Sequence, residues 1–175
     1  MNSAEIADIL RRDQQTTHYF RGVFASDELP KRQLPRPSAL VVNTDPSTEP
    51  GQHWVGIFIT KDGEGEYFDS YGQPPFLKSF ETFFRNHSDG TRFNRQRLQG
   101  PFSTVCGQYT LFYLLHRCRG MSMNAITRHF STDLNYNDVV VNDFIRRNFP
   151  RIRKEVYDGS FLTLQLSKAL CQSSS

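Results

Sequence analysis

HWVGIFITKDGEGEYFDSYG, residues 53–72, contains two short apolar segments separated by a glycine-rich turn. Residues 53–60 are apolar on both faces, which is typical of a central strand. Residues 66–72 predict a second strand that ends at a glycine. An antiparallel hairpin places the start of its first strand beside the end of its second. We therefore expect His53 and Asp69 to be neighbours.

The rest of the chain predicts helices and strands that surround this hairpin. Asn2 or Ser3 can cap a first helix with an apolar stripe, and a proline-punctuated loop is expected at residues 27–37. Further strands are expected at residues 38–44 and 92–99, the latter at an edge, and further helices at 74–87, 104–118, 122–131, 137–149 and 160–171. This order predicts an α+β domain with a mostly antiparallel central sheet packed by helices.

Length and composition favour one intracellular domain. The 175 residues suggest a single domain over residues 1–171, followed by a disordered tail at 172–175, and 15 Phe with 7 Tyr indicate a packed core. No apolar run approaches the ~18 residues of a membrane span, and the N-terminus lacks the pattern of a secretory signal. Three cysteines without an export signal favour a reducing compartment and free thiols. We therefore expect a monomer that is not secreted, does not associate with a membrane and holds no metal ion.

Positive charge is concentrated in the second half of the chain. Residues 1–88 carry 9 basic and 12 acidic side chains, whereas residues 89–175 carry 12 and 6. This asymmetry makes the second half the candidate contact for a polyanion such as DNA. The alternative is an ordinary solvated basic face. The densest group of cationic residues comprises Arg146, Arg147, Arg151, Arg153 and Lys154.

Cys106 is placed where a thiol becomes reactive. A Gly-Pro turn precedes it, and Ser103 or Thr104 is expected to cap the apolar helix that follows. The first turn of a helix has unpaired N–H groups and a positive dipole end, which favour a thiolate. The alternative is a buried structural cysteine, the expected fate of Cys118 further along the same helix.

A nucleophilic cysteine needs a base, an orienting group and oxyanion donors. His53 stands at the mouth of the central strand beside Asp69, and Phe68 and Tyr71 could shield that pair from water; the alternative for Asp69 is an ordinary turn bond. The backbone N–H of Cys106 and the side chain of Gln99 are candidate donors, although Gln99 could equally be a surface residue. The other histidines do not suit the role: His116 lies ~15 Å along the helix from the cysteine, His87 and His129 are expected to be solvated, and His18 lies in a connecting segment.

Four short motifs carry a family resemblance: VNT (42–44), HW (53–54), YFDSYG (67–72) and QGPFSTVCG (99–107). In this order they resemble the adenovirus-type cysteine protease, adenain, and its relatives in large virus-like DNA transposons. The wider clan includes the SUMO and NEDD8 proteases.

The resemblance implies a role for each candidate residue: Cys106 as nucleophile, His53 as base, Asp69 as orienting acid and Gln99 as oxyanion donor. Adenain has glutamate where this chain has Asp69, and the deconjugating relatives have aspartate. Adenain is linked by a disulfide to an activating peptide, but no cysteine lies between Asp69 and Cys106 for such a link. Adenain is also stimulated by DNA, which makes DNA a candidate activator here, with no cofactor required.

The leading hypothesis from the sequence is a cysteine endopeptidase that matures virus-like structural precursors by cutting next to glycine. The resemblance then places it in the host nucleus or cytoplasm, or packaged in virions. A second hypothesis keeps the chemistry and takes the Gly-Gly tail of a ubiquitin-like modifier as substrate. A third is a non-catalytic protein- or DNA-binding module that has kept the fold.

Overall fold

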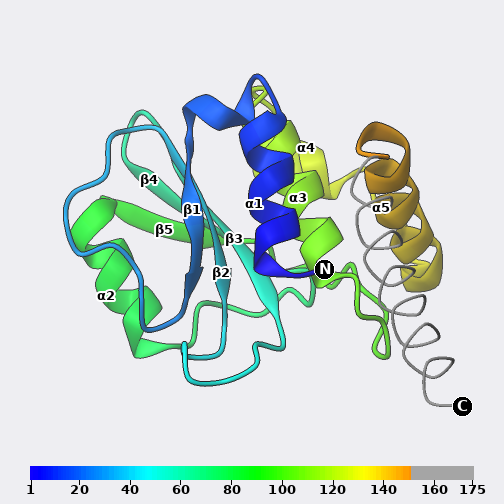
Figure 1. Ribbon diagram of the computed structural model, residues 1–175, viewed down its shortest axis with the longest axis horizontal. Coiled ribbons are helices and arrows are strands. Elements are labelled where there is room, and N and C mark those ends of the chain that lie inside the picture. Colours follow the sequence, from blue (N-terminus) through cyan, green and yellow to red (C-terminus); the bar gives the residue numbers. More distant parts are fainter. Residues whose placement is uncertain (151–175) are drawn as a thin grey trace, which may run out of the picture.

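The predicted hairpin forms the middle of a five-stranded sheet. In the computed structural model, which describes residues 1–150, β3 (Trp54–Ile59) runs antiparallel to β4 (Glu64–Phe68), with Gly56 opposite Phe68. The strand order is β1-β2-β3-β4-β5 (Figure 1). The outer strands are β1 (Phe20–Ala25), β2 (Ser38–Asn43) and β5 (Gly90–Phe93).

The sheet is mixed, which corrects the expectation of a mostly antiparallel one. β2 and β3 pair antiparallel, as do β3 and β4, but β1–β2 and β4–β5 are parallel. Each parallel pair has a long connection: a loop joins β1 to β2, and a segment containing α2 (Lys78–His87) joins β4 to β5. Parallel neighbours require such crossovers, because the chain must return to the same end of the sheet. The α+β class itself is confirmed.

The helices cover both faces of the sheet. One core combines residues of the sheet with α1 (Ser3–Arg12), α3 (Cys106–Arg117), α4 (Met123–Thr127) and α5 (Leu134–Asn148). The other core lies under α2, on the opposite face of the sheet (Figure 1). It contains Val55, Ile57 and Ile59 of β3, whereas Phe58 belongs to the first core. Burial of both faces explains why β3 is apolar throughout.

Several predicted boundaries shift. The structure confirms Asn2 as the cap of α1, where its side chain and that of Glu5 form a capping box. α2 begins after Pro74 and Pro75, not at them, because a residue before proline avoids helical geometry. The pattern at 20–25 did not predict β1, whose residues are all half-buried and lack alternation. The helix expected at 122–131 shortens to α4. α5 starts at Leu134, earlier than the expected residue 137, and Asp133 caps it. The expected helix at 160–171, the tail and the end of the domain lie outside the described residues.

Within residues 1–150, no helix has the length and apolar character that crossing a bilayer requires.

A buried carboxylate ties α3 to the sheet. Glu66 of β4 is inaccessible to solvent and accepts hydrogen bonds from Arg117 Nε (2.7 Å) and the Tyr113 hydroxyl (2.5 Å), and it also pairs with Arg92. Burial alone would raise the pKa of Glu66, but these donors hold it below its ordinary value. On the neighbouring strand, a Cβ at Gly56 would lie 3.1 Å from Tyr113, so glycine there lets α3 approach closely.

We predict that Glu66→Ala lowers the free energy of unfolding by about 3 kcal/mol, because removing one member of a buried pair leaves Arg117 as an uncompensated charge. Urea denaturation followed by circular dichroism measures this. Glu64→Ala is the matched control: its carboxylate lies 3.3 Å from Arg92 at the surface, and the expected loss is below about 1 kcal/mol. Equal losses for the two variants would show that the buried network does not hold α3.

Candidate active site

The hairpin brings His53 and Asp69 into direct contact, as the sequence predicted. His53 immediately precedes β3 and Asp69 immediately follows β4, and His53 Nε2 lies 2.9 Å from Asp69 Oδ1. The same carboxylate oxygen accepts the backbone N–H of Tyr71 at 2.7 Å. Asp69 is 1 % exposed. A buried carboxylate fixed in this way sets the tautomer of the imidazole and leaves Nδ1 for a second partner.

Asn94 clamps the backbone of Asp69, a contribution that the sequence analysis did not identify. Its side-chain oxygen accepts the N–H of Asp69 at 2.9 Å, and its amide nitrogen donates to the Asp69 carbonyl at 2.6 Å. Asn94 is buried and follows β5, so it prolongs the β4–β5 pairing through a side chain. No motif in the sequence marks such a contact between segments that are 25 residues apart.

Cys106 is the first residue of α3 and faces His53. The structure corrects the predicted caps: neither Ser103 nor Thr104 caps the helix, which begins after Val105 without any side-chain cap. The uncapped end leaves first-turn N–H groups and the positive end of the helix dipole at the thiol. Cys106 is 7 % exposed, so it is close to the surface but not freely solvated.

The electrostatics favour an imidazolium–thiolate pair. Burial alone would raise the pKa of the Cys106 thiol, but hydrogen bonds from His53 and from the backbone of Trp54 and Gly107 lower it below its ordinary value. Burial would likewise lower the pKa of His53, but hydrogen bonds to Asp69 and Cys106 raise it to about 9. In both residues the charged partner outweighs desolvation, so each stabilises the charged form of the other.

Aromatic rings border the pair on two sides. The Tyr71 ring lies 5.0 Å from the His53 ring, as expected for a shield. Phe68 does not share this role: it stacks on Tyr113 at 4.4 Å in the core. The Trp54 indole N–H donates to the Met1 carbonyl at 3.2 Å. A Cβ on Gly107 would lie 3.3 Å from the Trp54 ring, so glycine permits this close approach beside the thiol.

Gln99 lies beside the site but is already engaged. It is fully buried, which excludes the surface alternative. Its oxygen accepts the Ser70 hydroxyl at 2.6 Å, and its amide nitrogen donates to the Ser103 carbonyl at 2.8 Å. A side-chain amide has two hydrogens. The same nitrogen also lies 3.4 Å from the Ser103 hydroxyl, so donation to an oxyanion requires the second hydrogen to leave this longer contact.

The remaining histidines and Cys118 lie away from this chemistry. His18 and His129 are exposed, and His116 contacts the Phe112 carbonyl. The expectation of a solvated His87 is wrong: it is buried, with ring nitrogens 2.8 Å and 2.9 Å from the carbonyls of Phe83 and Arg32, because the segment before β2 covers the end of α2. Cys118 packs in the core as expected, and burial raises its pKa to about 11.

The predicted DNA contact is only partly within the described residues. Arg146 and Arg147 are exposed in the last turn of α5, and both pair with Asp143, at 3.0 Å and 3.6 Å. This pairing neutralises part of their charge. Arg151, Arg153 and Lys154 lie outside the described residues, so the DNA contact stays a prediction. Within residues 1–150, no group of three or more metal-ligating side chains is suited to holding a metal ion.

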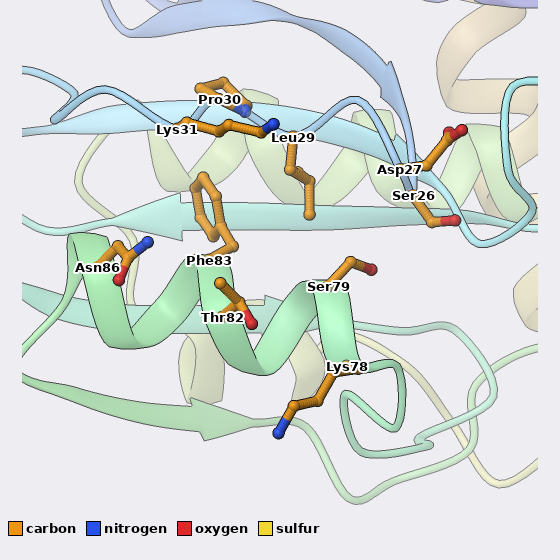
Figure 2. A pocket seen from close by; sticks show the side chains of 10 residues that line it. All are labelled: Ser26, Asp27, Leu29, Pro30, Lys31, Lys78, Ser79, Thr82, Phe83 and Asn86. Carbon is orange, nitrogen blue, oxygen red and sulfur yellow. The ribbon is translucent and has the colours of Figure 1, made fainter.

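One cavity adjoins the candidate site and another lies apart from it. A cavity of about 360 Å³ lies against Trp54 and is bordered by the N-terminal residues 1–3, the end of β1 and the 43–51 loop. A cavity of about 220 Å³ lies between the 26–31 loop and α2, where Leu29 and Phe83 face each other across it (Figure 2). It contains none of the candidate catalytic residues. The first cavity likewise contains none of them, and it approaches the site through Trp54, the residue after His53.

Comparison with known sequences finds cysteine proteases. No protein-family model matches the chain. A cysteine protease S273R of African swine fever virus (isolate Tick/Malawi/Lil 20-1/1983) is 34% identical over 110 residues, 54% of this chain and 39% of that protein. A SUMO-1 cysteine protease S273R of isolate Tick/South Africa/Pretoriuskop Pr4/1996 is 34% identical over 97 residues, 47% of this chain and 34% of that protein. The matches therefore span less than two fifths of either relative.

Comparison with solved structures confirms the fold. The crystal structure of the African swine fever virus pS273R protease aligns with a TM-score of 0.52 and 21% identity, over 81% of this chain and 66% of that one. The central domain of Lpg1148, an uncharacterized protein of Legionella pneumophila, aligns with a TM-score of 0.50 and 12% identity, over 88% and 98%. The chain thus has a fold that a viral cysteine protease also has. The named relatives support the resemblance to the adenain and SUMO-protease clan, but not to its adenovirus-type members.

We predict that Cys106 reacts with iodoacetamide before Cys118, because its thiolate is stabilised at neutral pH whereas burial keeps the Cys118 thiol protonated. Peptide mapping by mass spectrometry after partial labelling identifies the modified residue. His53→Ala should return the pH dependence of Cys106 labelling to that of an ordinary thiol. Preferential labelling of Cys118 in the folded protein would contradict the assignment.

Proposed function

We propose that this chain is a cysteine protease in which Cys106, His53 and Asp69 form the catalytic triad. The observation that carries the proposal is the contact of a helix-terminal thiol with an imidazole that is itself bonded to a buried carboxylate. Structural cysteines do not require such a partner, and a binding module would not need all three groups. The fold shared with a viral cysteine protease and the sequence matches to cysteine proteases support the same reading.

In the acylation half of the reaction, the Cys106 thiolate attacks the carbonyl carbon of a peptide bond. The carbonyl electron pair moves to oxygen, where the Cys106 backbone N–H and the second Gln99 amide hydrogen donate to it. As the C–N bond breaks, the His53 imidazolium gives its proton to the leaving amine. A thioester to Cys106 and a neutral imidazole remain.

In the deacylation half, neutral His53 takes a proton from water, and the resulting hydroxide attacks the thioester. Breaking the C–S bond releases a carboxylic acid and restores the thiolate beside the imidazolium. Asp69 stabilises the imidazolium in both halves without itself being protonated.

For the substrate, we propose a polypeptide with glycine at the scissile bond, and favour the Gly-Gly tail of a ubiquitin-like modifier. Three of the related viral proteases carry the name SUMO-1 cysteine protease, which supports this choice over maturation of a structural precursor. The tight packing of Trp54 on Gly107 also favours a residue without a side chain near the thiol. The proposal requires no bound cofactor, leaves DNA as an activator to be tested, and places the enzyme in the host nucleus or cytoplasm or in virions.

The test is cleavage of a substrate panel: SUMO and ubiquitin fused through their Gly-Gly tails to a reporter, and short peptides with or without glycine at the scissile position. We expect release from at least one glycine-containing substrate and none with Cys106→Ala. Cleavage of the SUMO or ubiquitin fusions but not of the short peptides supports deconjugation. Cleavage of the short glycine-containing peptides as well supports precursor maturation. No cleavage of any substrate by folded, thiol-reactive protein would contradict the proposal.

We predict that His53→Ala abolishes cleavage, whereas Asp69→Asn leaves residual activity, because an unoriented imidazole is still an acid and base. General acid–base catalysis is worth about 10²–10⁴-fold. Since the imidazolium is the active acid, kcat/KM of the wild type should fall as pH rises through about 9, the pKa of His53. It should also fall at low pH, where the Cys106 thiolate is protonated. His129→Ala, at an exposed position, is the control. A wild-type rate in folded His53→Ala would exclude the triad.

We predict that Gln99→Ala lowers kcat on the order of 10²–10³-fold with little change in KM, because its second amide hydrogen meets charge that exists only in the transition state. Steady-state kinetics on the best substrate separates the two parameters. Gln96→Ala, at an exposed position on the same loop, should change neither. A raised KM with normal kcat would make Gln99 a substrate-binding residue.

A further inference from the structure

An arginine stands at the edge of the candidate active site. The guanidinium carbon of Arg97 lies 5.2 Å from the centre of the Tyr71 ring, whose own centre is 5.0 Å from that of His53. The sum of these two distances is the upper limit, so the guanidinium carbon lies within about 10 Å of the centre of the His53 ring. Arg97 therefore lies near enough to affect a group bound at the thiol.

Two interactions hold this side chain in place. The ring of Tyr71 attracts the cation through its electron-rich face, and Arg97 Nε donates to the Gln99 carbonyl at 3.1 Å. An arginine held in this way loses less conformational entropy when its remaining N–H groups bind a carboxylate. Those groups belong to an exposed side chain, so a ligand can reach them.

The charge of Arg97 is not neutralised by the residues that the structure describes. None of the ion pairs within residues 1–150 includes it. The two carboxylates nearest the site are engaged elsewhere: Asp69 with His53, and Asp138 with the Tyr109 hydroxyl at 2.9 Å and the Gly100 N–H at 3.3 Å. An uncompensated cation thus faces solvent within about 10 Å of the His53 ring.

We infer that Arg97 is a specificity-determining residue that binds an acidic side chain of the polypeptide substrate. An extended chain advances ~3.3–3.6 Å per residue, so a reach of about 10 Å places this acidic residue within about three positions of the scissile bond. The inference rests on the proposed function, and adds to it a preference for substrates with Asp or Glu close to the cleaved glycine.

The first test compares peptides that differ only by Glu, Gln or Lys at each of the three positions on either side of the scissile bond. Wild-type protein should favour Glu at one of them by about two- to fivefold in kcat/KM, the range of a partly exposed ion pair. Arg97→Gln keeps an N–H donor for Gln99 and should abolish the preference, and Arg97→Glu should favour Lys there instead. Arg95→Gln is the matched control, because Arg95 lies two residues away over Phe93 and its loss should leave the preference intact.

Two outcomes of this test contradict the inference. A preference for Glu that survives in Arg97→Gln would place its origin elsewhere. An equal loss on the Glu and Gln peptides would show that Arg97 only supports the loop that carries Gln99.

The second test does not depend on proteolysis. Iodoacetate and iodoacetamide alkylate the same thiol, but only iodoacetate is an anion, so the ratio of their rates at Cys106 reports the local positive charge. Arg97→Gln should lower this ratio about twofold at low salt, Arg95→Gln should not, and added salt should reduce the difference. If no peptide is cleaved but the ratio falls, the proposed function fails while Arg97 still acts on anions at the thiol. An unchanged ratio in Arg97→Gln overturns the inference.

Discussion

The antiparallel register of β3 and β4 is the constraint on which the site depends. With Gly56 opposite Phe68, the start of β3 and the end of β4 lie at the same end of the sheet, and there the side chains of His53 and Asp69 meet. A one-residue slip would move every side chain of a strand to the other face of the sheet. It would both separate the pair and expose the apolar residues that bury the two faces of β3. The packing of the core therefore fixes the chemistry at its edge.

The second requirement is that α3 begin at this edge with its N-terminus uncapped. Glu66 and Tyr113 hold the helix against the sheet, and the missing cap leaves the first-turn N–H groups for the thiol. Burial by itself would neutralise both Cys106 and His53. Since burial strengthens electrostatic attraction as well as penalising isolated charge, the mutual stabilisation outweighs the cost only while the two groups remain in contact.

The sequence was most informative where local rules and chemistry coincide. The hairpin, the capped start of α1 and the meeting of His53 with Asp69 follow from periodicity, capping and turn chemistry within short segments. The parallel pairings of β1 and β5 did not follow, because they depend on where long connections return the chain. The Asn94 clamp, the burial of His87 and the engagement of Gln99 also escaped, since each depends on contacts between distant segments that no local pattern encodes.

The most direct test of the central claim is the titration of His53 itself. In protein labelled at its histidine rings, NMR chemical shifts followed from pH 5 to beyond 10, with the resonance assigned by its loss in His53→Ala, report the ionisation of this imidazole. An imidazolium held between Asp69 and the Cys106 thiolate should titrate at about pH 9. A midpoint near the ordinary histidine value of ~6.5 would mean that no ion pair forms at neutral pH, and would contradict the account.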